Sequence, residues 1–109
     1  MSLIEIFEKS VADRFDGDRL VEIKSQVPRD KKKFKVAPRE ITQMNKYANI
    51  IKTKETGIYY DGGVLNEVGP FVGVDYFCNH KGVAEAFKEE IDASDLKGKA
   101  KVYLNKREI

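Results

Sequence analysis

The stretch GIYYDGGVLNEVGPFVGVDYFC, residues 57–78, constrains the fold most, because it joins β-forming residues to glycine-rich turns. Five of the chain's eight glycines lie in it. The Asp-Gly and Gly-Gly pairs of YDGGV accept the positive φ of a tight hairpin turn, and EVGPF provides a second turn. The segment therefore predicts three strands, at about 57–60, 64–68 and 71–78, arranged as a meander.

Helical periodicity marks three other segments. Apolar residues recur at spacings of three and four over 38–53 and again over 81–93, which is typical of helices that bury one face. Near the N-terminus, Ser2 and Glu5 match a capping box, and the apolar stripe that follows predicts a helix over 3–15. We expect about three helices in total.

Strict alternation of apolar and polar residues predicts further strands at 19–27, at 33–36 and at 99–105. The resulting order, α-β-β-α-β-β-β-α-β, predicts an α+β fold, with a mainly antiparallel sheet and the helices packed on it. The length of 109 residues suits a single domain, 1–109. We expect its core to contain Phe7, Val21, Ile23, Phe34, Ile41, Met44, Val74, Phe87 and Val102.

The charge is unevenly distributed, although the net charge is only +2. Residues 24–54 carry ten basic and two acidic groups, whereas the segments on either side each have a net charge of −3. The densest part is RDKKKFKV, residues 29–36, with five basic side chains and one acid. This basic block is the strongest compositional signal in the chain.

The basic block has two interpretations. Neutralising phosphates releases counterions, so a continuous positive patch favours nucleic-acid binding. Lysines on an exposed edge strand also prevent edge-to-edge aggregation, which requires no ligand at all. An acidic protein partner would suit the same charges. The candidate nucleic-acid-binding residues are Lys31, Lys32, Lys33, Lys35, Arg39 and Lys46.

One further pair, Cys78 and His80, has the residue types of a thiolate nucleophile and its base. The alternative, which we favour, is that Cys78 is a small core residue and His80 caps the following helix. Two residues do not complete a metal site, and the chain carries no phosphate-binding glycine motif, so we predict neither metal nor cofactor. DRFDGD, residues 13–18, lacks the spacing of a calcium loop and is interpreted as a helix end.

The sequence thus predicts a small non-enzymatic binding module that contacts nucleic acid through residues 29–46. The alternative is a protein-interaction component, such as a regulator, inhibitor or assembly subunit. A phage origin and self-association are both compatible with this alternative. An enzyme using Cys78 and His80 is the less favoured third hypothesis. No apolar run approaches the roughly 18 residues of a membrane span, and a lone cysteine forms no internal disulfide, so we expect a cytoplasmic protein that does not bind membranes.

Overall fold

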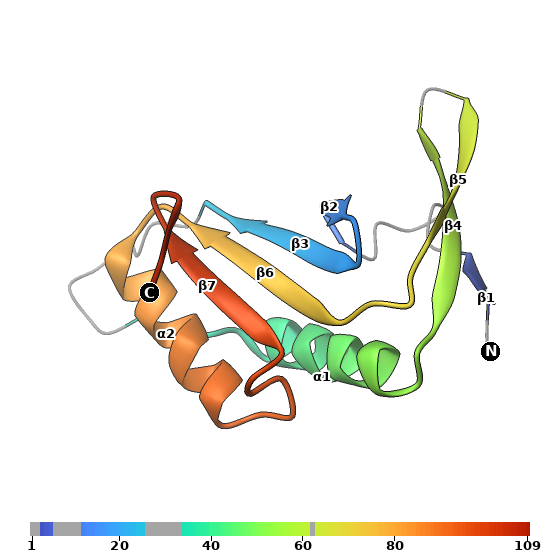
Figure 1. Cartoon of the computed structure of the whole chain (residues 1–109). Coiled ribbons are helices and arrows are strands. Elements are labelled where there is room, and N and C mark those ends of the chain that lie inside the picture. The colour runs from blue at the N-terminus through green and yellow to red at the C-terminus, as the bar shows by residue number, and fades with distance from the viewer. Residues whose placement is uncertain (1–2, 6–11, 26–33, 62) are drawn as a thin grey trace.

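Two helices and eight strands form a small α+β fold in the described residues, 3–5, 12–25, 34–61 and 63–109 of this computed structural model (Figure 1). The helices are α1 (Pro38–Lys52) and α2 (Lys81–Asp92). The strands are β1 (Leu3–Glu5), β2 (Arg14–Asp16), β3 (Arg19–Lys24), β4 (Thr56–Asp61), β5 (Val64–Val68), β6 (Gly73–Cys78), β7 (Ala100–Leu104) and β8 (Arg107–Glu108). The helices expected at 38–53 and 81–93 are confirmed, as are the strands at 57–60, 64–68, 71–78 and 99–105 to within a few residues.

The larger sheet is mixed, with the order β2-β3-β6-β7-β8. Its three central strands, β3, β6 and β7, are mutually parallel, and the short edge strands β2 and β8 pair antiparallel. The expectation of a mainly antiparallel sheet is therefore wrong for this sheet. The reason is that helices connect the central strands, and a helical crossover returns the chain to the start of a parallel neighbour.

Both helices lie on the same face of the larger sheet (Figure 1). The chain crosses from β3 to β6 through α1, and from β6 to β7 through α2, so both crossovers advance in the same direction across the sheet. Crossovers of one hand that advance in one direction place their helices on one side. Neither α1 nor α2 covers the opposite face, which we call the open face.

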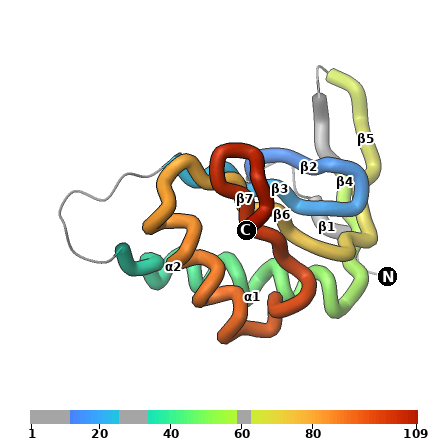
Figure 2. Tube along the Cα trace, turned by 60° about the vertical axis from the view of Figure 1, so that its left-hand side comes forward, coloured from blue at the N-terminus to red at the C-terminus, as the bar shows by residue number. Residues whose placement is uncertain are grey.

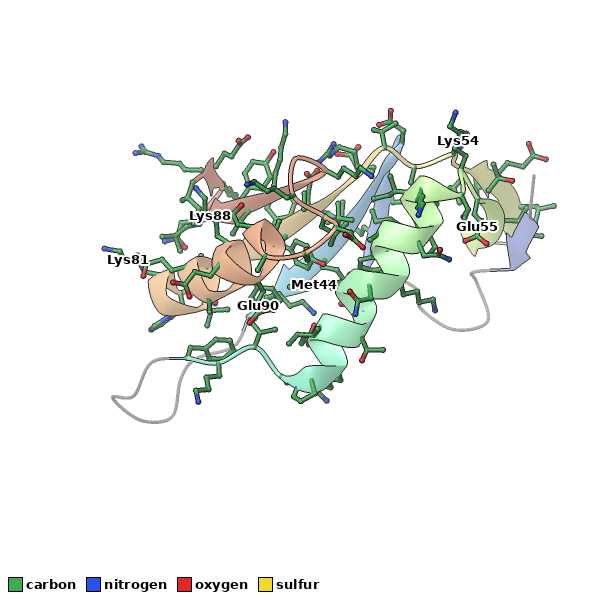
Figure 3. All side chains as sticks on the ribbon, turned by 90° about the horizontal axis from the view of Figure 1, so that it is seen from below. Met44, Lys54, Glu55, Lys81, Lys88 and Glu90 are labelled. Carbon is green, nitrogen blue, oxygen red and sulfur yellow. The ribbon has the colours of Figure 1, made fainter. Side chains whose placement is uncertain are left out.

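The core lies between the sheet and the helices. Alternate residues of the central strands face the helices, and Tyr76 of β6 stacks on Phe87 of α2 with ring centroids 5.4 Å apart. Met44 is buried on the side of α1 that faces α2 (Figure 3). Burial is confirmed for five of the predicted core residues, Val21, Met44, Val74, Phe87 and Val102, while Phe34 is partly buried and Phe7 lies outside the described residues.

The predicted burial is wrong for two residues, Ile23 and Ile41. Ile23 is 48% exposed, because β3 presents Glu22 and Lys24 to the helices and therefore turns Ile23 to the open face. Alternation alone placed the charged residues outside, but both find partners on α1. Ile41 is 36% exposed on the outward side of α1.

The helix expected at 3–15 is also wrong: Leu3–Glu5 is strand β1 and Arg14–Asp16 is strand β2. Asp16 pairs with Arg19, so Gly17, at φ 61°, begins a two-residue hairpin turn into β3. The two turn residues are therefore Gly17 and Asp18, and Gly-Asp between two strands is a hairpin signal. The interpretation of residues 13–18 as a helix end is therefore also wrong, because residues 14–18 form part of the β2–β3 hairpin.

A strand was also expected at 33–36. The described residues of that range, 34–36, have no regular structure, and neither has residue 37. The supposed partner of this strand, β3, is already paired on both sides, with β2 and β6. The meander is wrong as well: β4 and β5 form a hairpin that pairs with β1 in a separate three-stranded sheet, while β6 joins the larger sheet. The β4–β5 hairpin projects from the rest of the molecule (Figure 2).

Candidate nucleic-acid interface

The exposed side of α1 carries three cations, Arg39, Lys46 and Lys52, which we call the α1 cationic face. Arg39 and Lys46 are seven residues apart, so they lie on one line along the helix. Lys52 lies about 120° around the helix from that line, at the other margin of the exposed side, since each residue turns the helix by about 100°. The one acid of α1, Glu40, points inward and is buried. The charged residues on the exposed side of this helix are therefore all cations, although Glu40 Oε1 lies 4.0 Å from Arg39 Nε.

A polar hollow of about 440 Å³ borders the α1 cationic face. Asn45, Asn49 and Lys52 of α1 line one side, and Asp95 and Lys99, from the connection between α2 and β7, line the other. The hollow adds amide donors and a further cation to the face. Sequence reasoning missed Lys52, although an exposed helix side without acids was visible in the spacing of residues 38–52.

The structure brings together only part of the predicted basic block. Arg39 and Lys46 share the α1 cationic face. Lys35 is exposed but lines a separate hollow of about 290 Å³ with Glu89 and Glu90 of α2, so acids surround its charge. The remaining candidates, Lys31, Lys32 and Lys33, lie outside the described residues.

A buried ionic cluster, formed by Glu22, Lys24, Glu40 and Tyr47, joins β3 to the inner side of α1. Lys24 Nζ lies 2.6 Å from Glu40 Oε2 and 3.5 Å from Glu22 Oε2. The Tyr47 hydroxyl donates a short hydrogen bond to the Glu22 carboxylate. Buried charges are tolerated only when they are paired in this way, so the cluster fixes which side of α1 faces outward.

The electrostatics of the cluster follow from burial. Burial raises the pKa of Glu22, while the Tyr47 hydrogen bond and the charge of Lys24 act in the opposite direction. Burial also raises the pKa of Tyr47, and its hydrogen bond to Glu22 adds to the effect. Tyr47 therefore remains protonated at any physiological pH and serves as a permanent donor.

Cys78 and His80 have the structural roles expected of them. Cys78 is buried in the core, and burial raises the pKa of its thiol to about 11. His80 is the N-cap of α2, where its Nδ1 accepts the Gly82 N–H at 3.1 Å. A raised thiol pKa is the opposite of what activates a cysteine nucleophile.

The chain matches no protein-family model, no curated protein and no solved structure. Within the part of the chain that the structure describes, no group of three or more His, Cys, Asp or Glu side chains is placed to hold a metal ion. Across the same residues, no helix is both long and apolar enough to cross a membrane. The geometry of the molecule therefore carries the functional argument.

Proposed function

We propose that this protein is a non-enzymatic binding module that contacts nucleic acid through the α1 cationic face. The observation that carries the proposal is the set of three exposed cations, Arg39, Lys46 and Lys52, on a helix whose single acid is buried and paired with Lys24. Such a face attracts phosphates with little competition from carboxylates, because Glu40, which lies 4.0 Å from Arg39, is also held by Lys24. The raised pKa of the Cys78 thiol supports a role without covalent catalysis.

The test is a salt titration of nucleic-acid binding with the variant Arg39→Gln/Lys46→Gln/Lys52→Gln. Fluorescence anisotropy with labelled oligonucleotides gives the slope of log affinity against log salt concentration. Each lost phosphate contact reduces the magnitude of that slope by about 0.7–0.9, so the triple variant should flatten it by roughly 2–3 units. The fold should remain intact because all three side chains are exposed.

The matched control is Lys81→Gln/Lys88→Gln/Lys97→Gln, which removes the same charge from other exposed positions. Lys81 and Lys88 lie on the side of α2 that points away from α1 (Figure 3). This control should lower the affinity only through the change in net charge. It should keep most of the slope of log affinity against log salt concentration. Equal slopes for both triple variants, or no binding by the native protein at low salt, would refute the proposal.

A second candidate function, protein association, is favoured by the β4–β5 hairpin. Its outer strand, β5, is the edge of the three-stranded sheet, and Val64 and Leu65 are 63% and 52% exposed. An exposed apolar edge strand is a template for pairing with another chain. Sedimentation velocity of Leu65→Lys against the native protein tests it: association that this charge leaves unchanged would place the contact elsewhere.

A further inference from the structure

The open face of the larger sheet has an apolar row at one end. In the register of the parallel strands, Ile23 of β3 lies beside Phe77 of β6, and Phe77 lies beside Tyr103 of β7. Parallel sheets in proteins are normally covered on both faces. Here neither described helix covers this row, and Ile23 is half exposed. Within the described residues, a parallel sheet with an apolar row that no helix covers favours a ligand at that position.

The rings in this row have a defined arrangement. Phe77 and Tyr103 stack with centroids 4.7 Å apart and planes at 13°. Because Tyr103 covers the face of Phe77 that looks toward β7, the other face of the Phe77 ring looks toward β3 and Ile23. The opposite end of the open face is polar, since Arg19 Nε donates a hydrogen bond to Asp75 at 2.8 Å. The uncovered aromatic face is thus confined to one end of the sheet.

An open hollow of about 560 Å³ lies over this ring face, with Ile23 and Phe77 among its walls. It sits at the carboxyl ends of the parallel strands, where β3, β6 and β7 all end. The volume is that of a small-molecule site. Two cations, Arg14 and Lys106, and two amides, Asn79 and Asn105, complete the lining that bears on recognition.

The positions of these polar groups are built into the fold. Asn105 and Lys106 form the two-residue turn between β7 and β8, and both have positive φ, at 49° and 70°. Such a turn is rigid and holds Lys106 beside the hollow. Arg14 comes from β2, and the neighbouring acid, Asp13, accepts the Ile23 backbone N–H at 2.7 Å.

We propose that this hollow binds a nucleotide unit, with an unpaired base packed against Ile23 and the exposed part of the Phe77 ring. The base would cover the part of the Phe77 ring that Tyr103 and Ile23 leave exposed, and Arg14 and Lys106 would bind its phosphate. Asn79 and Asn105 have the donors and acceptors for base edges. The proposal deepens the proposed function, on which it rests for the ligand class, by naming an unpaired strand or a free nucleotide.

The site is independent of the α1 cationic face, because α1 lies on the other side of the sheet (Figures 1 and 2). The chain contains no tryptophan, so a single Phe77→Trp substitution gives a fluorescent reporter that also preserves the aromatic platform. Lys88→Trp, on the exposed outer side of α2, is the matched reporter away from the site. The probes are single-stranded oligodeoxythymidylate, its duplex with oligodeoxyadenylate, and thymidine monophosphate.

The single strand should quench Trp fluorescence in Phe77→Trp and leave Lys88→Trp unchanged. Quenching by the monophosphate as well would identify a free nucleotide as ligand, whereas quenching by the strand alone would identify an unpaired strand. Removing the platform with Phe77→Leu should weaken single-strand binding roughly 5- to 150-fold. The exposed Lys106→Gln, which leaves the core intact, should flatten the salt slope by about 0.7–0.9.

Absence of quenching by both the strand and the monophosphate at low salt would overturn the inference. Equal quenching by the duplex would also overturn it, because a paired base cannot insert. Failure of the proposed function can be distinguished from failure of this inference. If the α1 cationic face does not bind nucleic acid, Arg39→Gln/Lys46→Gln/Lys52→Gln leaves binding unchanged while the Phe77→Trp signal persists.

Discussion

Substitution of Lys24 by Met removes the one cation of the buried ionic cluster while keeping most of the side-chain stem. Lys24 is 7% exposed and lies 2.6 Å from Glu40 and 3.5 Å from Glu22, with its Nζ 5.8 Å from the centroid of the Phe87 ring. Met is similar in shape, so the cavity contribution is small. The dominant effect is that both buried carboxylates lose their nearest cation, and only Glu40 keeps a second one, Arg39 at 4.0 Å.

Breaking a buried pair in this way costs about 3–5 kcal/mol. The total free energy of unfolding of a domain of this size is on the order of 5–15 kcal/mol, so Lys24→Met should remove about a fifth or more of it. A pair on the sheet's open face shows the contrast. Lys101 and Glu108 are 3.9 Å apart with about half of each side chain exposed, so Lys101→Met should cost at most about 1 kcal/mol.

The assay is urea unfolding followed by far-UV circular dichroism at about pH 7 and about pH 4. At neutral pH the midpoint of Lys24→Met should fall by at least about 1 M, given slopes of about 1–3 kcal/mol/M. The deficit should shrink at the lower pH, because protonation neutralises the orphaned carboxylates. A loss below about 1 kcal/mol at neutral pH, or an equal loss at both pH values, would show that the cluster does not couple these charges.

Three further predictions concern buried groups. Phe87→Ala should cost about 3–5 kcal/mol in urea unfolding, because Phe87 is fully buried against Tyr76; a cost below about 1 kcal/mol would mean that α2 does not pack inward. The Cys78 thiol, whose pKa burial raises to about 11, should react with a thiol reagent at about pH 8 orders of magnitude more slowly in the folded than in the urea-unfolded protein, since about one thiol in a thousand is then ionised. Equal rates in the two states would contradict its burial. Burial raises the pKa of Glu22 in the folded state, so its ionisation destabilises the native protein as the pH rises from the ordinary Glu pKa through the raised value. Glu22→Gln, which cannot ionise, should therefore gain in stability relative to the native protein between about pH 4 and about pH 8, and a constant difference would refute this sign.

The helices were predictable, whereas the pairing of the strands was not. The periodic stripes of α1 and α2 are long and local, so they identify the helices directly. The orientation of β3 depends on partners on α1, which follow 16 or more residues later. Alternation assigns Glu22 and Lys24 to solvent because it has no information about those partners. The β2–β3 hairpin, by contrast, was visible as Gly17-Asp18, but a helical stripe over the same residues obscured it.

The candidate sites divide in the same way. The spacing of Arg39 and Lys46 predicted a shared exposed helix side, and both residues are exposed on α1. The row of Ile23, Phe77 and Tyr103 was hidden, because it requires the parallel register of β3, β6 and β7 and the outward turn of Ile23. Sequence patterns report the neighbours along one element, and this row joins three elements that are far apart in the chain.

The parallel pairing of β3 with β6 also determines when the protein can fold. Arg19 of β3 pairs with Gly73 of β6, 54 residues later in the chain, and β6 in turn pairs with β7 at Ala100–Leu104. Such distant pairings require loop closure before any contact offsets it, which slows folding. During synthesis, β3 leaves the ribosome with only β2 to pair with, and its central position in the sheet is filled seconds later. The chain must therefore be made through β7 and β8 before the larger sheet is complete.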